Sequence, residues 1–136
     1  MIQLFQRRGF IYDQLPAILW ALLIFVASSI PNITLPDLDF VPSDKAIHLV
    51  VYFILCSLVY RALLYQDRFP RLAKWSIACT VLLSIVYGVS DEFHQSFVPN
   101  RDASMYDLAA DSIGAFLFLG YSLLRRRSNS RAKQPD

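Results

Sequence analysis

Hydrophobic residues fall in four long blocks that short charged segments separate. Residues 14–36 carry no Asp, Glu, Lys or Arg, and neither do residues 46–60, 75–90 and 112–124. A helix needs about 20 residues to cross about 30 Å of hydrocarbon. Only the first block is that long, so the other three would cross with polar flanks inside the membrane. We therefore predict an all-α integral membrane bundle of four transmembrane helices, at about 14–31, 43–65, 74–95 and 104–124.

The same pattern divides the chain into three parts. Residues 1–13 form an N-terminal segment, residues 14–124 the transmembrane domain, and residues 125–136 a basic tail. The polar residues from 128 onward are expected to be disordered. The first block also has features of a signal peptide, with a small-residue site at 27–29. Its apolar stretch is slightly long for that role, so we interpret it as a span.

Composition supports a membrane protein. The 136 residues are 55% hydrophobic and 18% charged, whereas typical soluble domains are about 45–50% apolar and about 25% charged. This excludes disorder and coiled coil and argues against an ordinary soluble core, since too few polar residues remain to cover it. The net charge of +2 gives no indication of a nucleic-acid partner. Cys56 and Cys79 lie in apolar blocks and are interpreted as buried hydrophobic residues.

Positive charge is sorted between the two sides of the predicted bundle. If the four spans alternate, 11 of the 13 Lys and Arg residues fall on the side of both termini, and only Lys45 and Arg101 fall on the other. Cytoplasmic segments carry such an excess of Lys and Arg. We therefore expect a multi-pass protein of the bacterial inner membrane with cytoplasmic N- and C-termini. Eight of the acids fall on the outer side: Asp37, Asp39, Asp44, Asp91, Glu92, Asp102, Asp107 and Asp111.

Polar residues recur at helical spacing near the outer end of three predicted helices. Asp44, His48 and Tyr52 are spaced four residues apart, with Lys45 beside them. Ionisable groups at membrane depth normally face the bundle interior. We therefore expect one shared polar cluster, which the other two helices complete with Asp91, Glu92, Gln95, Asp107 and Asp111. Gly114 and Ala110 would let a neighbouring helix approach the last of these helices closely.

Asp91 and Glu92 lie at the C-terminal end of their predicted helix. Acids there oppose the helix macrodipole, and breaks of a local rule tend to mark functional or strained sites. A positive charge should compensate them. Lys45 and Arg101 are the fixed positive charges on that side. A metal ion or a cationic ligand group is the alternative.

Three motif blocks in this order resemble the VanZ-like family of small membrane proteins. The blocks are DKxxHxxxY from Asp44, DExxQxxxPxR from Asp91, and DxxxDxxG from Asp107. The resemblance implies a helical membrane domain, and the namesake of the family is associated with low-level teicoplanin resistance. It implies no defined reaction. The motif residues it assigns here are Asp44, Lys45, His48, Tyr52, Glu92, Gln95, Arg101, Asp107 and Asp111. Asn100 stands where the family often has Gly, and Asp111 where it often has Asn.

Two functional hypotheses follow for the polar cluster. In the first, the protein binds or modifies a lipid-linked envelope precursor, with Lys45 and Arg101 holding a phosphate or carboxylate. The other ligand-binding residues would then be Gln95, Tyr52, Asp44, Asp107 and Asp111. In the second, it is a metal-dependent hydrolase or transferase acting on a lipid-linked phosphate. Glu92, His48 and Asp91 would be its catalytic candidates, with Glu92 or His48 as general base.

Other interpretations stay open at this stage. The chain contains no HExxH or similar metal-ligand spacing, and a purely structural ion-pair network would also explain the cluster. Cation-coupled transport is less favoured, because the inner halves of the spans carry no charged relay. The sequence leaves open whether a reaction is catalysed, which cofactor is used, and whether the protein is an oligomer.

Overall fold

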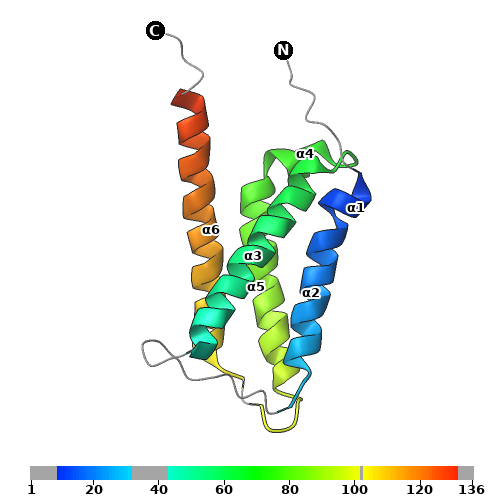
Figure 1. Cartoon of the computed structure of the whole chain (residues 1–136), viewed down its shortest axis with the longest axis vertical. Coiled ribbons are helices and arrows are strands. Elements are labelled where there is room, and N and C mark those ends of the chain that lie inside the picture. Colours follow the sequence, from blue (N-terminus) through cyan, green and yellow to red (C-terminus); the bar gives the residue numbers. More distant parts are fainter. Residues whose placement is uncertain (1–8, 32–42, 102, 132–136) are drawn as a thin grey trace.

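The chain folds into an all-helical bundle over the residues that can be described. The computed structural model describes residues 9–31, 43–101 and 103–131, and it contains no strand within these ranges. Figure 1 shows the helices in chain order. They are α1 (Phe10–Asp13), α2 (Leu15–Ser28), α3 (Ser43–Tyr65), α4 (Pro70–Lys74), α5 (Ser76–Gln95) and α6 (Met105–Arg131).

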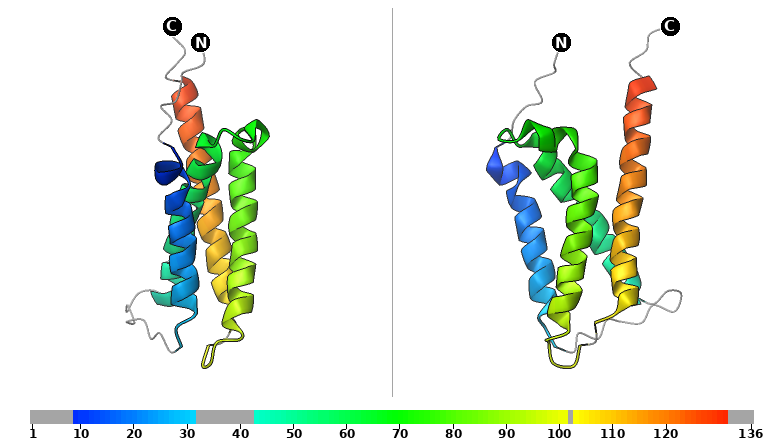
Figure 2. Two further views of the ribbon diagram at one scale, coloured as in Figure 1. Left: turned by 90° about the vertical axis from the view of Figure 1, so that its right-hand side faces the viewer. Right: turned by 180° about the vertical axis from the view of Figure 1, so that it is seen from behind.

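Four helices form the bundle, and they run alternately in opposite directions (Figures 1 and 2). We call one end of the bundle the polar end, where α2 and α5 finish and α3 and α6 begin. The opposite end, which we call the basic end, holds α1, α4 and the last turns of α6. The predicted alternation of the four blocks is therefore confirmed as a feature of the fold.

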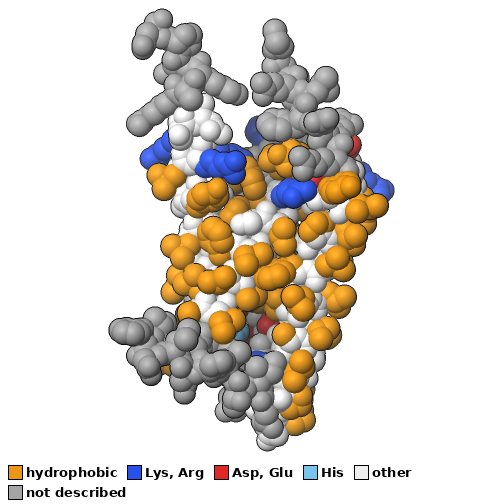
Figure 3. All heavy atoms as spheres, in the orientation of Figure 1, with side chains coloured by type: hydrophobic (Ala, Val, Ile, Leu, Met, Phe, Trp, Pro, Cys, Tyr) orange, Lys and Arg blue, Asp and Glu red, His pale blue; other side chains and the backbone are white. Residues whose placement is uncertain are grey.

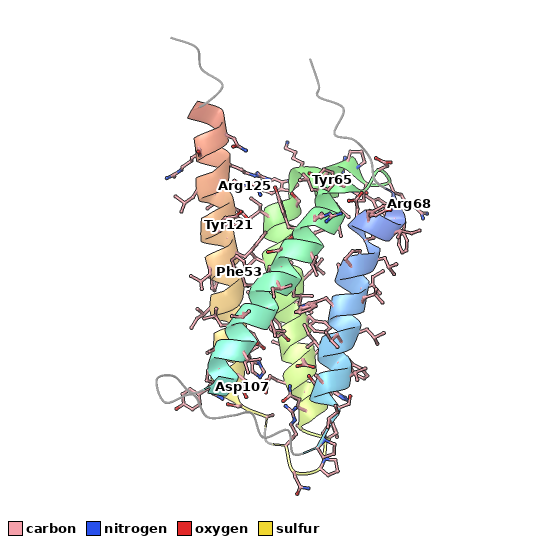
Figure 4. All side chains as sticks on the ribbon, viewed as in Figure 1. Phe53, Tyr65, Arg68, Asp107, Tyr121 and Arg125 are labelled. Atoms are coloured by element: carbon pink, nitrogen blue, oxygen red, sulfur yellow. The ribbon has the colours of Figure 1, made fainter. Side chains whose placement is uncertain are left out.

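Helix α3 is the centre of the bundle, because it packs against α2, α5 and α6. Its contact with α2 buries Tyr52 and Leu55 against Ile24. On the α6 side, Cys56 packs with Phe118 and Ala115. Farther out on the same contact, the rings of Phe53 and Tyr121 lie edge to face with their centroids 6.2 Å apart (Figure 4).

Gly114 sets the close approach of α6 to α3. A Cβ at this position would collide with the carbonyl oxygen of Leu49 and lie 3.2 Å from the backbone nitrogen of Phe53. Small residues at helix contacts let backbones approach in this way. The predicted close approach on the face of Ala110 and Gly114 is thus confirmed, and α3 is the neighbour.

The outer surface of the bundle is apolar over most of its height. Figure 3 shows hydrophobic side chains around its middle, with Lys and Arg concentrated near the basic end. Large side chains such as Leu82, Val86 and Phe116 are more than half exposed. Exposed apolar surface of this extent is costly in water and is typical of helices that face lipid.

Three helices are long and apolar enough to cross a membrane: Lys45–Tyr65, Ser76–Gln95 and Met105–Asn129. The predicted first span is not confirmed in the same way, because α2 contains only 14 residues. At 1.5 Å per residue it rises about 21 Å, which is less than the hydrocarbon thickness. The helix is interrupted at Gln14, which separates α2 from the short helix α1.

Two predicted helix ends need correction. The last helix does not stop at residue 124 but continues to Arg131, so residues 128–131 are helical rather than disordered. The third predicted helix begins at Ser76, because the backbone of Trp75 departs from helical geometry and separates α5 from α4. Charged residues bound the apolar block in both places, Lys74 before residues 75–90 and Arg125 after residues 112–124. The helix boundary does not coincide with the boundary of the block in either place.

Candidate functional site

The predicted polar residues gather at the polar end of the bundle. Nine of the ten have described side chains, and these come from the start of α3, the end of α5, the loop after it and the start of α6: Lys45, His48, Tyr52, Asp91, Glu92, Gln95, Arg101, Asp107 and Asp111. The side chain of Asp44 lies outside the described residues. Figure 4 shows Asp107 at this end, beside the start of α3.

Two pairs of side chains join α3 to α6. His48 Nδ1 and Asp111 Oδ1 are hydrogen-bonded at 2.9 Å, and Asp111 is only 1% exposed. One turn nearer the polar end, the Lys45 ammonium pairs with the Asp107 carboxylate. Both helices begin at this end, and the residues are spaced three apart on α3 and four apart on α6. Residues at either spacing share a helix face, so the two pairs lie one above the other.

Glu92 closes the end of α5 against the start of α6. Its Oε2 atom accepts a hydrogen bond of 2.8 Å from the backbone N–H of Ser104, which directly precedes α6. The positive end of the α6 macrodipole therefore compensates this carboxylate. Asp107, in the first turn of α6, does not cap Ser104, because its carboxylate pairs with Lys45.

Asp91 lies on the other side of α5, toward α2. Its Oδ2 atom accepts hydrogen bonds of 2.8 Å from the Ser28 hydroxyl and 2.9 Å from the Gln95 side-chain amide. All three side chains are buried. The single expected cluster is thus divided into two groups on neighbouring sides of α5. The Asp91 group consists of Ser28, Asp91 and Gln95 and faces α2. The second group contains Glu92 and faces the start of α6.

Arg101 extends the Asp91 group toward the surface. Its guanidinium donates to Gln95 Oε1 at 3.1 Å and to the backbone carbonyls of Ala27 and Ile30. All three acceptors are neutral, and no ion pair of Arg101 with a carboxylate occurs among the described residues. Asn100, the residue before Arg101, takes a left-handed φ of 59°, which Asn tolerates better than most residues.

Several buried oxygens in the two groups have no hydrogen-bond partner within the described part of the chain. They are Tyr52 Oη, Asp91 Oδ1, Glu92 Oε1 and Asp111 Oδ2. An unsatisfied buried polar group costs about 1–3 kcal/mol, and more when it is charged. These four oxygens therefore destabilise the fold unless they find a partner outside the described residues.

His48, Glu92 and Asp111 are the closest group of metal-ligating side chains in the described residues. Each offers one ligand atom, and these atoms lie within 4.8 Å of one another. Asp91 and Asp107 do not join this group, because Asp91 faces α2 and the Asp107 carboxylate pairs with Lys45.

The structure adds residues that the sequence analysis did not assign to the site. Ser28 donates a hydrogen bond to Asp91, whereas the sequence indicated Ser28 only as part of the small-residue site at 27–29. Gly88 lies where a Cβ would come 3.3 Å from both Asp111 Oδ2 and the Tyr52 ring. Its position four residues before Glu92 places it on the same helix face, and this spacing could have identified it.

His94 lies apart from the two groups. Its Nε2 is hydrogen-bonded to the Ser29 hydroxyl at 2.9 Å, and its ring stacks on Phe25 with the centroids 4.5 Å apart. His94 is half-buried, and these contacts join the end of α5 to the end of α2.

Comparison with known proteins identifies the family. The family model of VanZ/LLP1 matches residues 14–126, which is most of the chain and includes every helix of the bundle except α1 and the last turn of α6. Searches of curated proteins and of solved structures returned no match. The family match, the membrane-type helices and the three motif blocks at the polar end agree with one another, and the chain belongs to the VanZ/LLP1 family.

Proposed function

We propose that this protein binds the phosphate of a lipid-linked envelope precursor at the polar end of its bundle. The observation that carries the proposal is the bonding of Arg101, whose guanidinium contacts only neutral acceptors in the described structure. No carboxylate of the described residues neutralises its positive charge, which leaves the guanidinium available to an anion. Arginine is suited to this role because its planar fork can bind two phosphate oxygens at once.

The position of Arg101 fits a ligand that enters from the membrane surface. The residue is partly exposed and follows the turn after α5, at the end of the apolar surface. A lipid tail can then lie along the apolar helices while its phosphate reaches the guanidinium. Lys45 is less suited to bind the phosphate, because Asp107 already neutralises it.

The proposal includes an orientation in the bacterial inner membrane. The polar end faces outward and the basic end, with both termini, faces the cytoplasm, in accord with the bias of Lys and Arg toward cytoplasmic segments. In this arrangement α2 acts as a fourth, short span beside α3 and α5. A lipid-linked cell-wall precursor displayed on the outer leaflet then lies level with Arg101.

Resistance to teicoplanin would be a consequence of this binding, since glycopeptides act on cell-wall precursors outside the membrane.

A metal-dependent hydrolase or transferase is the second candidate, and the grouping of His48, Glu92 and Asp111 favours it. A purely structural network is supported by the Lys45–Asp107 pair. It does not explain the neutral partners of Arg101 or the unpartnered carboxylate oxygens.

The test compares ligand binding by the purified full chain and by two arginine variants. The ligands are a short-chain polyprenyl monophosphate and the matching polyprenol, and binding is measured by native mass spectrometry in one detergent. We expect Arg101→Gln to weaken phosphate binding by about tenfold or more, because a hydrogen bond to a charged group contributes about 1.5–3 kcal/mol.

Arg125→Gln is the matched control, because Arg125 is an exposed arginine at the basic end. It should bind the phosphate like the wild type. Unchanged binding by Arg101→Gln, or an equal loss in Arg125→Gln, would contradict the proposal.

A further inference from the structure

We propose that His48, Glu92 and Asp111 form a binding site for one divalent transition-metal ion of the Zn²⁺ or Mn²⁺ class. The three residues come from α3, α5 and α6, so the site lies where the central helices meet. This inference deepens the proposed function and rests on it for the role of the metal, though not for its binding.

The spacing of the ligand atoms fits a cation after a small movement of side chains. The three atoms lie within 4.8 Å of one another, and His48 Nδ1 is already 2.9 Å from Asp111 Oδ1. Zinc binds nitrogen and oxygen ligands at about 2.0–2.2 Å in tetrahedral geometry, so two ligands of one ion lie about 3.3–3.6 Å apart. Side-chain rotations that change the separations of these atoms by about 1 Å would bring them to that spacing.

The unpartnered atoms around this group point to a missing ligand. Glu92 Oε1 and Asp111 Oδ2 are buried without a hydrogen-bond partner in the described structure. Tyr52, which is 1% exposed, lies one turn from His48, and its hydroxyl is also unpartnered. The ring edge of Tyr52 and Asp111 Oδ2 both border the space beside Gly88, where a Cβ would lie 3.3 Å from each. Asp111 Oδ2 and the Tyr52 ring therefore border the same place, and the ligand atoms of Glu92 and Asp111 lie within 4.8 Å of each other.

Charge gives an independent argument. A structural ion-pair network would provide Glu92 and Asp111 with Lys or Arg partners. Among the described residues, Lys45 pairs with Asp107, Arg101 bonds to neutral groups, and Glu92 accepts the N–H of Ser104. Asp111 has the His48 imidazole as its partner. Buried charges are normally paired or coordinate metals. A divalent cation would offset Glu92 and Asp111, for which the described part of the chain shows no ion pair with Lys or Arg.

The ligand types select the class of metal. Imidazole is a ligand of Zn²⁺ and other transition metals, whereas Ca²⁺ and Mg²⁺ prefer sites built from oxygen alone. Three protein ligands leave at least one coordination position open, as is typical of zinc sites that act on a substrate. A phosphate oxygen of the lipid-linked precursor is the ligand that the proposed function supplies for that position.

The experiment titrates the metal-free, purified full chain with Zn²⁺, Mn²⁺ and Ca²⁺ separately, by isothermal calorimetry in the absence of lipid. We expect one Zn²⁺ or Mn²⁺ per chain and weaker binding of Ca²⁺. His48→Gln, Glu92→Gln and Asp111→Asn should each reduce the affinity by about tenfold or more, because loss of supporting residues alone typically costs 10–100-fold.

Two variants control for adventitious binding and for misfolding. His94→Gln removes the second of the two histidines of the chain and should leave the metal affinity unchanged. Asp13→Asn removes a buried carboxylate that pairs with Arg61 at the basic end. It should lower thermal stability without changing the metal affinity.

Three outcomes would overturn the metal site: no binding of Zn²⁺ or Mn²⁺, tighter binding of Ca²⁺, or equal losses in His94→Gln and His48→Gln. If the metal does not bind but polyprenyl phosphate binding still depends on Arg101, only this inference fails. If the metal binds as expected and polyprenyl phosphate does not bind, the proposed function fails and the metal site stands.

Discussion

Glu92 illustrates at the residue scale how structural and functional roles share one side chain. Its Oε2 atom caps the start of α6 through the N–H of Ser104, while its Oε1 atom has no partner in the described structure. The position of the acid at the end of α5 could be read from the sequence. The cap could not, because it joins residues that meet only once α5 and α6 are packed.

The two roles can be separated by substitution. Glu92→Gln keeps an oxygen acceptor for Ser104 and removes a buried negative charge, so we expect its free energy of unfolding to stay within about 1 kcal/mol of the wild type. Glu92→Ala loses the cap and should be destabilised by about 1–2 kcal/mol. Thermal or denaturant unfolding in one detergent measures both. A Glu92→Gln variant as unstable as Glu92→Ala would show that the charge itself holds the fold.

At the scale of the helices, the approach of α3 to α6 brings His48 to Asp111 and Lys45 to Asp107. The four-residue spacing of Gly114 and Ala110 predicted a close contact, and the structure confirms it with the backbone of Leu49. The sequence did not predict the length of α6 correctly. Arginine is a good helix former, so the charged residues 125–127 end the apolar block without ending the helix.

Gly114 and Gly120 form a matched pair that tests this contact. Gly114→Ala adds a methyl group against the backbone of α3, and overpacking of this kind costs about 1–3 kcal/mol. Gly120→Ala, in the same helix, meets no atom within 4 Å and should be neutral or stabilising, since Ala favours a helix by up to about 1 kcal/mol over Gly. Unfolding measurements on the two variants compare these effects. Equal stability would contradict the packing described for α3 and α6.

At the scale of the whole molecule, the two ends of the bundle differ in charge as well as in structure. The basic end carries Arg68, Arg125 and most other Lys and Arg residues, as Figures 3 and 4 show. This sorting follows from sequence alone, because it requires only the number of charge-free blocks and the charges between them. The division of the polar residues into two groups around α5 required the packed structure, since the directions of Asp91 and Glu92 depend on the rotation of that helix.

The proposed orientation can be tested by labelling single cysteines in intact cells. With Cys56 and Cys79 replaced by alanine, Asn100→Cys at the polar end should react with a membrane-impermeant maleimide. Ser128→Cys at the basic end should react only after lysis, because the excess of Lys and Arg places that end in the cytoplasm. Both positions are exposed, so differences in labelling report the side of the membrane. The reverse pattern would place the phosphate site on the cytoplasmic side.

The central claim is that the polar end recognises a lipid phosphate rather than a lipid tail. The most direct test is the ratio of the affinities of the wild-type chain for polyprenyl monophosphate and for the polyprenol of equal length. We predict a ratio of about ten or more in favour of the phosphate, from one charge-assisted interaction with Arg101. A ratio near one would show that only the apolar surface binds the lipid and would contradict the account.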